Sequence, residues 1–197
     1  MTRKPIQRLA LLISGNGSNL QAVLDAADEG FLPIQVCVVV SNRPGAYGLE
    51  RARLAAVPTA VLEKSPGQKR VEYDRELATL VEAYHPDWII LAGWMRLLSS
   101  TFLNRFPGRV VNLHPALPGT FPGTDAIQKA FIAFHNREIT HTGVMVHLVP
   151  DEGIDNGPVL AQEIVPIYPA DSLEQLEKRI HLVEHRLLVE TIHNLVS

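Results

Sequence analysis

The chain has 197 residues, of which 46% are hydrophobic and 20% charged, and its formal net charge is −3. This length and composition are typical of one globular domain with a full core, and the small net charge excludes a nucleic-acid binder that works by bulk electrostatics. The apolar runs are only as long as strands, which excludes a membrane span, and the single cysteine excludes an internal disulfide. We therefore expect one cytoplasmic domain over residues 1–197, with no membrane and no nucleic acid as partner.

Short apolar runs alternate with amphipathic stretches in the first half of the chain. The apolar runs predict strands at Leu9–Ile13, Ile34–Val40, Val57–Leu62, Trp88–Ala92 and Arg109–Leu113. The stretches between them predict helices at Asn19–Ala27, Tyr47–Ala55, Gln68–Tyr84 and Ser99–Phe106. Such alternation is typical of βαβ units, so we expect a mostly parallel, twisted sheet with helices on both faces.

The pattern changes in the second half of the chain. A loop rich in proline and glycine leads into a helix over Asp125–Asn136, and strands are expected at Thr142–Val149 and Val159–Ile167. The connection between these strands is too short for a crossover helix, so they should pair as an antiparallel excursion. A last helix begins near Asp171, which is expected to cap it. The predicted fold class is α/β.

Asn112 and His114 stand two residues apart at the end of the strand that precedes Pro115. Side chains two apart on a strand point to the same face, and open α/β sheets bind ligands at the carboxyl ends of their strands. An amide and an imidazole together at this edge predict a functional site. The alternative is a strand end whose polar side chains only satisfy nearby backbone groups.

The loop Ser14–Asn19 follows the first strand and opens the first helix. Its glycines allow backbone N–H groups to converge, and the positive end of the helix dipole favours an anion. We therefore expect a phosphate monoester here, with Ser18 capping the helix and Gln21 completing a capping box; a plain capped turn is the alternative. The loop has neither the third glycine of a dinucleotide fingerprint nor the Gly-Lys of a Walker A loop, and Arg43 leaves NADP as an alternative ligand.

His181, Glu184 and His185 match the H-x-x-E-H arrangement of some zinc enzymes, because two imidazoles four residues apart on a helix can share a metal. The same helix carries a long apolar stripe, and few residues remain after it to supply a third ligand. We therefore assign this helix to core packing and expect no metal site.

The loop between the last two strands contains one acid that differs from its neighbours. The Gly-Pro pair at 157–158 fixes the backbone immediately behind Asp155. If this loop folds back over the carboxyl edge of the sheet, the Asp155 carboxylate meets His114. Asp151 and Glu152 are expected to form only a solvated acidic turn.

Several short motifs follow one another along the chain: Ile13–Gln21, Val40–Asn42, Gly48–Ala52, Tyr73–Glu76, Leu91–Leu98, Asn112–Pro115, His147 and the Asp155 loop. Through these motifs and their order, the chain resembles the folate-dependent phosphoribosylglycinamide formyltransferases of purine synthesis. The resemblance covers nearly the whole chain. The resemblance implies a Rossmann-like formyltransferase fold. It also implies transfer of a formyl group from 10-formyltetrahydrofolate to the primary amine of glycinamide ribonucleotide, with the folate as cosubstrate, no tightly bound cofactor and no metal.

The resemblance also implies residue roles. The catalytic residues would be Asn112, His114 and Asp155. The ribonucleotide would be bound through its phosphate and its ribose by Gly17, Ser18, Asn19 and Glu184. The formyl folate would be bound by Arg70, Met95, Arg96, Leu97, Leu98 and Asn112. His147 would support the catalytic loop, and the protein would act on these small molecules as a monomer or homodimer.

The implied chemistry is attack of the amine on the formyl carbon, without a covalent enzyme intermediate. The Asn112 amide and a protonated His114 would donate hydrogen bonds to the oxyanion that forms. Asp155 would favour the imidazolium form by charge pairing and relay a proton from the amine.

The chain departs from the commoner family pattern at residues 116–125, which contain no histidine where that pattern has one shortly after the Asn-His-Pro motif. Two related classes are alternatives: methionyl-tRNA formyltransferases, which carry a tRNA-binding domain, and formyltetrahydrofolate hydrolases, which have His-His where this chain has His114 and Pro115. We expect neither. A noncatalytic sensor of phosphate ligands is an alternative of another class, but binding alone does not need a matched Asp–His–Asn set.

Overall fold

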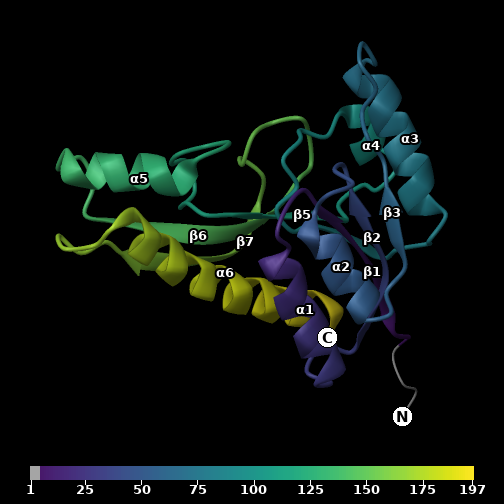
Figure 1. The fold of residues 1–197 in the computed structure, drawn as a ribbon, viewed down its shortest axis with the longest axis horizontal. Helices are drawn as coiled ribbons and strands as arrows, with labels where there is room; N and C mark the ends of the chain where they lie inside the picture. The colour runs from purple at the N-terminus through teal and green to yellow at the C-terminus, as the bar shows by residue number, and fades with distance from the viewer. Residues whose placement is uncertain (1–4) are drawn as a thin grey trace.

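The computed structural model describes residues 5–197, so the first four residues of the expected domain lie outside the described part. Seven strands form one sheet in the order β3-β2-β1-β4-β5-β6-β7 (Figure 1). The strands are β1 (Gln7–Ile13), β2 (Ile34–Ser41), β3 (Thr59–Val61), β4 (Trp88–Leu91), β5 (Val110–His114), β6 (His141–Leu148) and β7 (Val159–Pro166). Strands β1 to β5 are parallel, whereas β6 pairs antiparallel with both β5 and β7. The expected parallel sheet with an antiparallel excursion is confirmed.

Six helices cover the two faces of this sheet. They are α1 (Ser18–Asp28), α2 (Tyr47–Leu54), α3 (Arg70–Glu82), α4 (Ser100–Leu103), α5 (Ala126–His135) and α6 (Leu173–Val196). Helices α1, α2, α5 and α6 contribute to one hydrophobic cluster and α3 and α4 to the other. Figure 1 shows α3 and α4 beside the parallel strands and α6 running along the β6–β7 hairpin.

Two predicted elements are shorter in the structure than the sequence pattern suggests. Strand β3 keeps only three residues of the expected Val57–Leu62, because it is an edge strand that begins after Pro58, which has no backbone N–H to donate. Helix α4 ends at Leu103, whereas Ser99–Phe106 was expected. Beyond it, Phe106 N–H donates to the carbonyl of Leu103, so the chain continues in a tighter turn.

Both predicted helix caps are wrong by one residue. Helix α1 is preceded by Gly17 in the left-handed region, at φ 77°, and no side chain caps it; Ser18 is its first residue. Helix α6 is capped by Ser172, which forms a capping box with Gln175. Asp171 instead pairs with Arg179, and the bonds from that guanidinium hold the pKa of Asp171 at about 2.

The apolar stripe expected on helix α6 is buried, and helix α3 carries a buried apolar stripe as well. On α3, Tyr73, Leu77 and Val81 are fully buried against the sheet. On α6, Leu176 and Ile180 are fully buried as well. Of the helices in residues 5–197, none is both long and apolar enough to cross a membrane.

Candidate active site

Strand β5 presents Asn112 and His114 on one face at its carboxyl end. The alternate side chains of Val111 and Leu113 lie in the hydrophobic cluster on the opposite face, so core packing fixes the direction in which the two polar side chains point. His114 is 4% exposed. Across the antiparallel pair, Asn112 stands opposite His147 of β6, so a second imidazole lies beside the first two side chains.

The loop after β6 brings Asp155 back to this face. Asp155 has a left-handed backbone at φ 50°, and a Cβ at Gly157 would lie 1.8 Å from the carbonyl oxygen of Leu148, so only glycine fits there. The Asp155 carboxylate accepts a hydrogen bond from Asn112 Nδ2 at 3.0 Å and lies 3.3 Å from His114 Nδ1. The structure therefore brings together the three side chains that the sequence analysis proposed as catalytic.

His147 is part of the same cluster of polar side chains. Its Nε2 lies 3.2 Å from Asn112 Nδ2 and 3.5 Å from Asp155 Oδ1, and its Nδ1 lies 2.8 Å from the carbonyl oxygen of Leu148. A carbonyl only accepts, so Nδ1 carries a hydrogen, and Nε2 faces both the Asn112 amide and the Asp155 carboxylate. In this arrangement both amide hydrogens of Asn112 are bound by protein acceptors. The resemblance did not imply the direct contact between His147 and Asp155.

The protonation of His114 follows from its two neighbours and its burial. Nε2 lies 3.0 Å from the carbonyl oxygen of Phe121, so Nε2 carries a hydrogen. Burial lowers the pKa of His114 below its usual value, although the Asp155 carboxylate favours the protonated ring. Burial alone would raise the pKa of Asp155, but contacts with His147, the Gly123 amide and His114 hold it below its usual value. The resting pair is therefore a carboxylate beside a neutral imidazole near pH 7.

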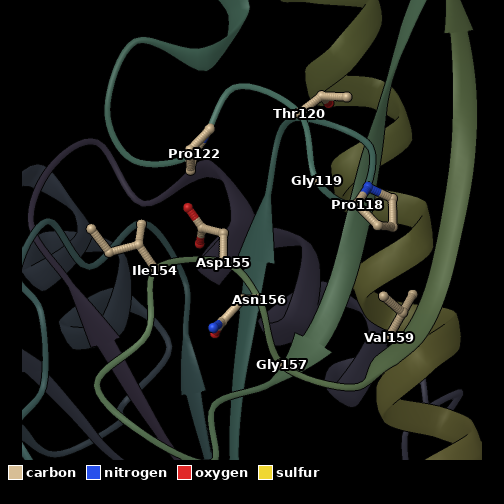
Figure 2. Close-up of a pocket in the computed structure, with 9 residues that line it drawn as sticks. All are labelled: Pro118, Gly119, Thr120, Pro122, Ile154, Asp155, Asn156, Gly157 and Val159. Atoms are coloured by element: carbon tan, nitrogen blue, oxygen red, sulfur yellow. The ribbon is translucent and has the colours of Figure 1, made fainter.

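The loop that follows β5 closes over this pair. Gly123 N–H donates to Asp155 Oδ2 at 2.9 Å, and the Phe121 carbonyl accepts from His114. Beside Asp155 a cavity of about 440 Å³ opens between this loop and the Asp155 loop. Figure 2 shows its lining residues, with the Asp155 carboxylate pointing toward Pro122 and with Pro118 and Val159 at the far end. The site thus has an open space next to its carboxylate.

The expected phosphate loop has the geometry of an anion site. Among residues 5–197, the backbone N–H groups of Asn16, Gly17, Ser18 and Asn19 have no protein acceptor. The last two open helix α1, where the helix dipole adds partial positive charge. The Gln21 side chain does not cap the helix as expected and instead donates to Asp25.

The expected folate-binding residues lie around the start of α3 and the segment after β4. Met95 and Leu97 are exposed, Arg96 lies over the Tyr73 ring, and the Leu98 side chain is buried in the core. Arg70 is exposed at the start of α3, where it forms an ion pair with Glu152.

Glu152 is a residue whose role sequence reasoning missed. It does not simply face solvent in an acidic turn, because it pairs with Arg70 and accepts from Ser100 N–H at 2.8 Å. Its hydrogen bonds with Ser100 and its contact with Arg70 hold its pKa below the usual value. Glu152 therefore links the Asp155 loop to helices α3 and α4. Its partner Arg70 lies 82 positions away in the sequence, so no local pattern predicted the contact.

Helix α6 carries the three residues considered as metal ligands. His181 Nδ1 lies 2.6 Å from Glu184 Oε2, which is a contact within one turn of the helix. His185 Nε2 is buried without a hydrogen-bond partner. Among residues 5–197, no three His, Cys, Asp or Glu side chains converge on one metal position. The Glu184 charge also favours protonation of His114.

Comparison with known proteins identifies the family. The formyl transferase family matches residues 7–192. A phosphoribosylglycinamide formyltransferase of Dictyostelium discoideum is 45% identical over 93% of this chain and 95% of its own length; that of Schizosaccharomyces pombe is 44% identical over 98% of both. The crystal structure of glycinamide ribonucleotide transformylase 1 from Geobacillus kaustophilus has a TM-score of 0.91 and 42% identity, covering 98% of this chain and 100% of the other. This chain is a formyltransferase and belongs to the phosphoribosylglycinamide formyltransferase family.

Proposed function

We propose that this chain transfers the formyl group of 10-formyltetrahydrofolate to the primary amine of glycinamide ribonucleotide, a step in the synthesis of the purine nucleotide IMP. Family membership supports this reaction and the folate as cosubstrate, with no tightly bound cofactor. The observation that carries the proposal is the convergence of Asn112, His114 and Asp155. One carboxylate lies 3.0 Å from the amide nitrogen and 3.3 Å from the imidazole nitrogen.

Asn112 and His114 stabilise the oxyanion in this proposal. When the amine attacks the formyl carbon, negative charge develops on the formyl oxygen, and hydrogen-bond donors already in place stabilise it; one such donor is worth about 3–4 kcal/mol. Both hydrogens of Asn112 Nδ2 bind protein acceptors in the resting site, so one bond has to open. The 3.2 Å bond to His147 is the longer of the two, and it is the one that is exchanged for the oxyanion.

Asp155 and His114 move the proton. The attacking amine must lose one proton, and N10 of the folate must gain one when its bond to the formyl carbon breaks. The neutral ring of His114 accepts the amine proton at Nδ1, through Asp155 or one water, and the adjacent carboxylate balances the imidazolium charge. The ring then returns this proton to N10. The acceptor Nδ1 of the imidazole thus serves the proton path, and its Nε2–H donates to the oxyanion once it has left the Phe121 carbonyl.

The substrates are bound on either side of this cluster. The free N–H groups of Gly17, Ser18 and Asn19 take the phosphate of the ribonucleotide, and Glu184 accepts from its ribose hydroxyls. The segment Met95–Leu98, in which Met95 and Leu97 are exposed, takes the formyl folate together with Arg70 and Asn112. Arg70 already pairs with one carboxylate, that of Glu152. This supports the proposal that Arg70 binds a carboxylate of the folate.

A deformylation assay tests the proposed function. The protein is mixed with glycinamide ribonucleotide and 10-formyltetrahydrofolate, and the absorbance change on loss of the formyl group is followed. Turnover that requires both substrates is expected. Absence of turnover, or turnover that proceeds equally well without the ribonucleotide, would contradict the transferase assignment.

We also propose that residues 1–197 form a single formyltransferase domain that works in the cytoplasm as a monomer or homodimer. One continuous sheet, with helices on both faces, supports the single domain. The lone cysteine, which is buried and unpaired, is compatible with a reducing compartment. Analytical ultracentrifugation across a range of protein concentrations distinguishes monomer from dimer.

A further inference from the structure

Helix α2 contacts the expected phosphate loop through Arg51, a side chain to which neither the resemblance nor the catalytic chemistry assigns a role. We propose that Arg51 is a positioning residue for the ribonucleotide: it holds the phosphate loop in the conformation that turns its N–H groups toward the substrate. The proposal rests on the phosphate site of the proposed function and adds a residue to it.

Three donors of one guanidinium bind this loop and the helix that follows it. Arg51 Nε donates to the Asn16 carbonyl at 2.9 Å, and Nη2 donates to Asn16 Oδ1 at 3.0 Å. Nη1 donates to Gln21 Oε1 on α1 at 3.2 Å. The guanidinium also lies over the Tyr47 ring, 4.9 Å from its centroid. Arg51 therefore links α1, α2 and the loop at one point.

The bond to the Asn16 carbonyl fixes the direction of an amide that binds phosphate. In a planar trans peptide the C=O and the following N–H point in opposite directions. Because Arg51 holds the Asn16 carbonyl toward α2, the N–H of Gly17 points away from α2. The preceding peptide is held in the same way, since Gly48 N–H donates to the Gly15 carbonyl at 3.1 Å, and this turns the N–H of Asn16 outward.

Two consecutive peptides are thus anchored on α2 by their carbonyls, and their N–H groups have no protein acceptor among the described residues. A hydrogen bond to a carbonyl polarises its peptide group and makes the N–H on the other side a stronger hydrogen-bond donor. With the first two amides of α1, this makes four donors for one anion. Arg51 acts through the loop, because the three donor nitrogens of its guanidinium already bind protein oxygens.

Arginine is required here for its shape as well as its charge. Its planar fork reaches the Asn16 carbonyl, the Asn16 side chain and Gln21 at once, whereas a lysine ammonium is a point donor on a flexible stem. Loss of the fork should therefore disorder the loop even where the positive charge is kept.

The test compares Arg51→Gln and Arg51→Lys with Arg53→Gln. Arg53 is the matched control, because it lies on the same helix, is exposed, and within residues 5–197 pairs only with Glu50. For both Arg51 variants we expect KM for the ribonucleotide to rise about tenfold or more, as for loss of a charge-assisted hydrogen bond, with KM for the folate within about twofold of wild type. The affinity for inorganic phosphate, measured by titration calorimetry, should fall in parallel.

The possible results separate the alternatives. A ribonucleotide KM at the wild-type value in Arg51→Lys would mean that only charge matters and would overturn positioning by the fork. An equal rise of both KM values would also overturn it, because that is the result of general destabilisation. If the Arg51→Gln chain fails to fold, Asn16→Ala decides, with a rise in KM for the ribonucleotide alone expected and an unchanged value contradicting the proposal. Absence of turnover in the wild-type protein would instead contradict the proposed function itself.

Discussion

Asp155 is the side chain on which the other groups of the site converge. It accepts from the Asn112 amide and from the Gly123 N–H, and both imidazoles lie within 3.5 Å of it. These donors compensate the cost of burying its charge, and the contacts with His147, the Gly123 amide and His114 keep the pKa of Asp155 low. The carboxylate thus orients the amide, closes the loop over the site and provides the countercharge for a protonated His114.

Replacement of Asp155 by asparagine keeps its size but removes this charge. We expect Asp155→Asn to lower kcat by about 10²–10⁴-fold, the range associated with positioned proton transfer, while the protein stays folded. Asp151→Asn in the same loop is the control, because Asp151 accepts only from the Gly153 N–H among the described residues. Steady-state kinetics with circular dichroism checks both. Turnover of a folded Asp155→Asn protein near the wild-type rate would contradict the proton path.

The His181–Glu184 pair makes stability depend on pH. The hydrogen bond to Glu184 raises the pKa of His181 above its usual value, so the folded protein binds this proton more tightly than the unfolded chain. The resulting stabilisation is fully present below the unfolded pKa of about 6.5 and is lost as the pH rises through the higher folded pKa.

His181→Gln should therefore lower the melting temperature more at pH 6 than at pH 9. Glu184→Gln serves as the partner control, since it removes the carboxylate that holds the proton and should abolish the same pH dependence. Thermal unfolding in a series of buffers measures both variants. A difference between wild type and His181→Gln that grows toward high pH would have the wrong sign for this pair.

The sequence was sufficient to predict which residues form the site, but it did not predict all of the contacts between them. Strand alternation put Asn112 and His114 on one face, and the Gly-Pro pair after Asp155 indicated a rigid loop. The contact of His147 with Asp155 depends on the register between β5 and β6, and no local pattern encodes that register. Glu152 looked like a solvated acid because its partner lies far away in sequence.

At the scale of elements, the phosphate loop and helix α2 depend on a close approach of two glycines. A Cβ at Gly17 would lie 2.7 Å from Gly48 Cα, and a Cβ at Gly48 would lie 2.5 Å from Ile13 Cδ1. Glycine at both positions lets α2 dock directly against the loop, and this docking brings Arg51 within reach of Asn16.

Gly48→Ala should break this docking. We expect it to destabilise the fold by about 1–3 kcal/mol, as overpacking does, and to weaken ribonucleotide binding more than folate binding. Gly45→Ala is the matched control just before the same helix, because a Cβ there would meet nothing within 4 Å. Denaturant unfolding and the two KM values measure the effect. Equal stability of the two variants would contradict the close approach.

Element types could be predicted from periodicity, whereas their ends depended on single backbone groups. The antiparallel pairing of β6 and β7 followed from a connection too short for a helix. The start of β3 was misplaced because Pro58 has no backbone N–H to donate. The cap of α6 was misplaced because Ser172 and Asp171 are both good capping residues. Arg179 decides which of these two neighbours caps the helix, because both of its Nη nitrogens donate to the Asp171 carboxylate.

At the scale of the whole molecule, β1 connects the two hydrophobic clusters. Its alternate side chains divide between them: Leu9, Leu11 and Ile13 enter one cluster and Ala10 and Leu12 the other. Strand–helix alternation was sufficient to predict this layered architecture, since each buried parallel strand has to cover both of its faces. Because the two clusters share this central strand, they are expected to unfold together.

The two tryptophans provide one reporter for each face of the sheet. Trp88 packs against the cluster that contains Leu11, and Trp94 belongs to the cluster that contains Leu12. In Trp88→Phe and Trp94→Phe backgrounds, the remaining indole therefore reports on one face alone. Leu12→Ala should destabilise the protein by about 2–5 kcal/mol, because it leaves a cavity in a fully buried position, and Leu11→Ala is the matched change on the opposite face.

If the sheet is one cooperative unit, each substitution lowers the denaturation midpoint of both reporters by the same amount. The fluorescence of Trp94 would then respond to Leu11→Ala as strongly as the fluorescence of Trp88 does. Midpoints that separate, with each substitution shifting only the tryptophan on its own face, would show that the two clusters unfold independently. Since the catalytic strand β5 pairs with β4 at the centre of this sheet, cooperative unfolding would also mean that enzymatic activity is lost at the same midpoint as both signals.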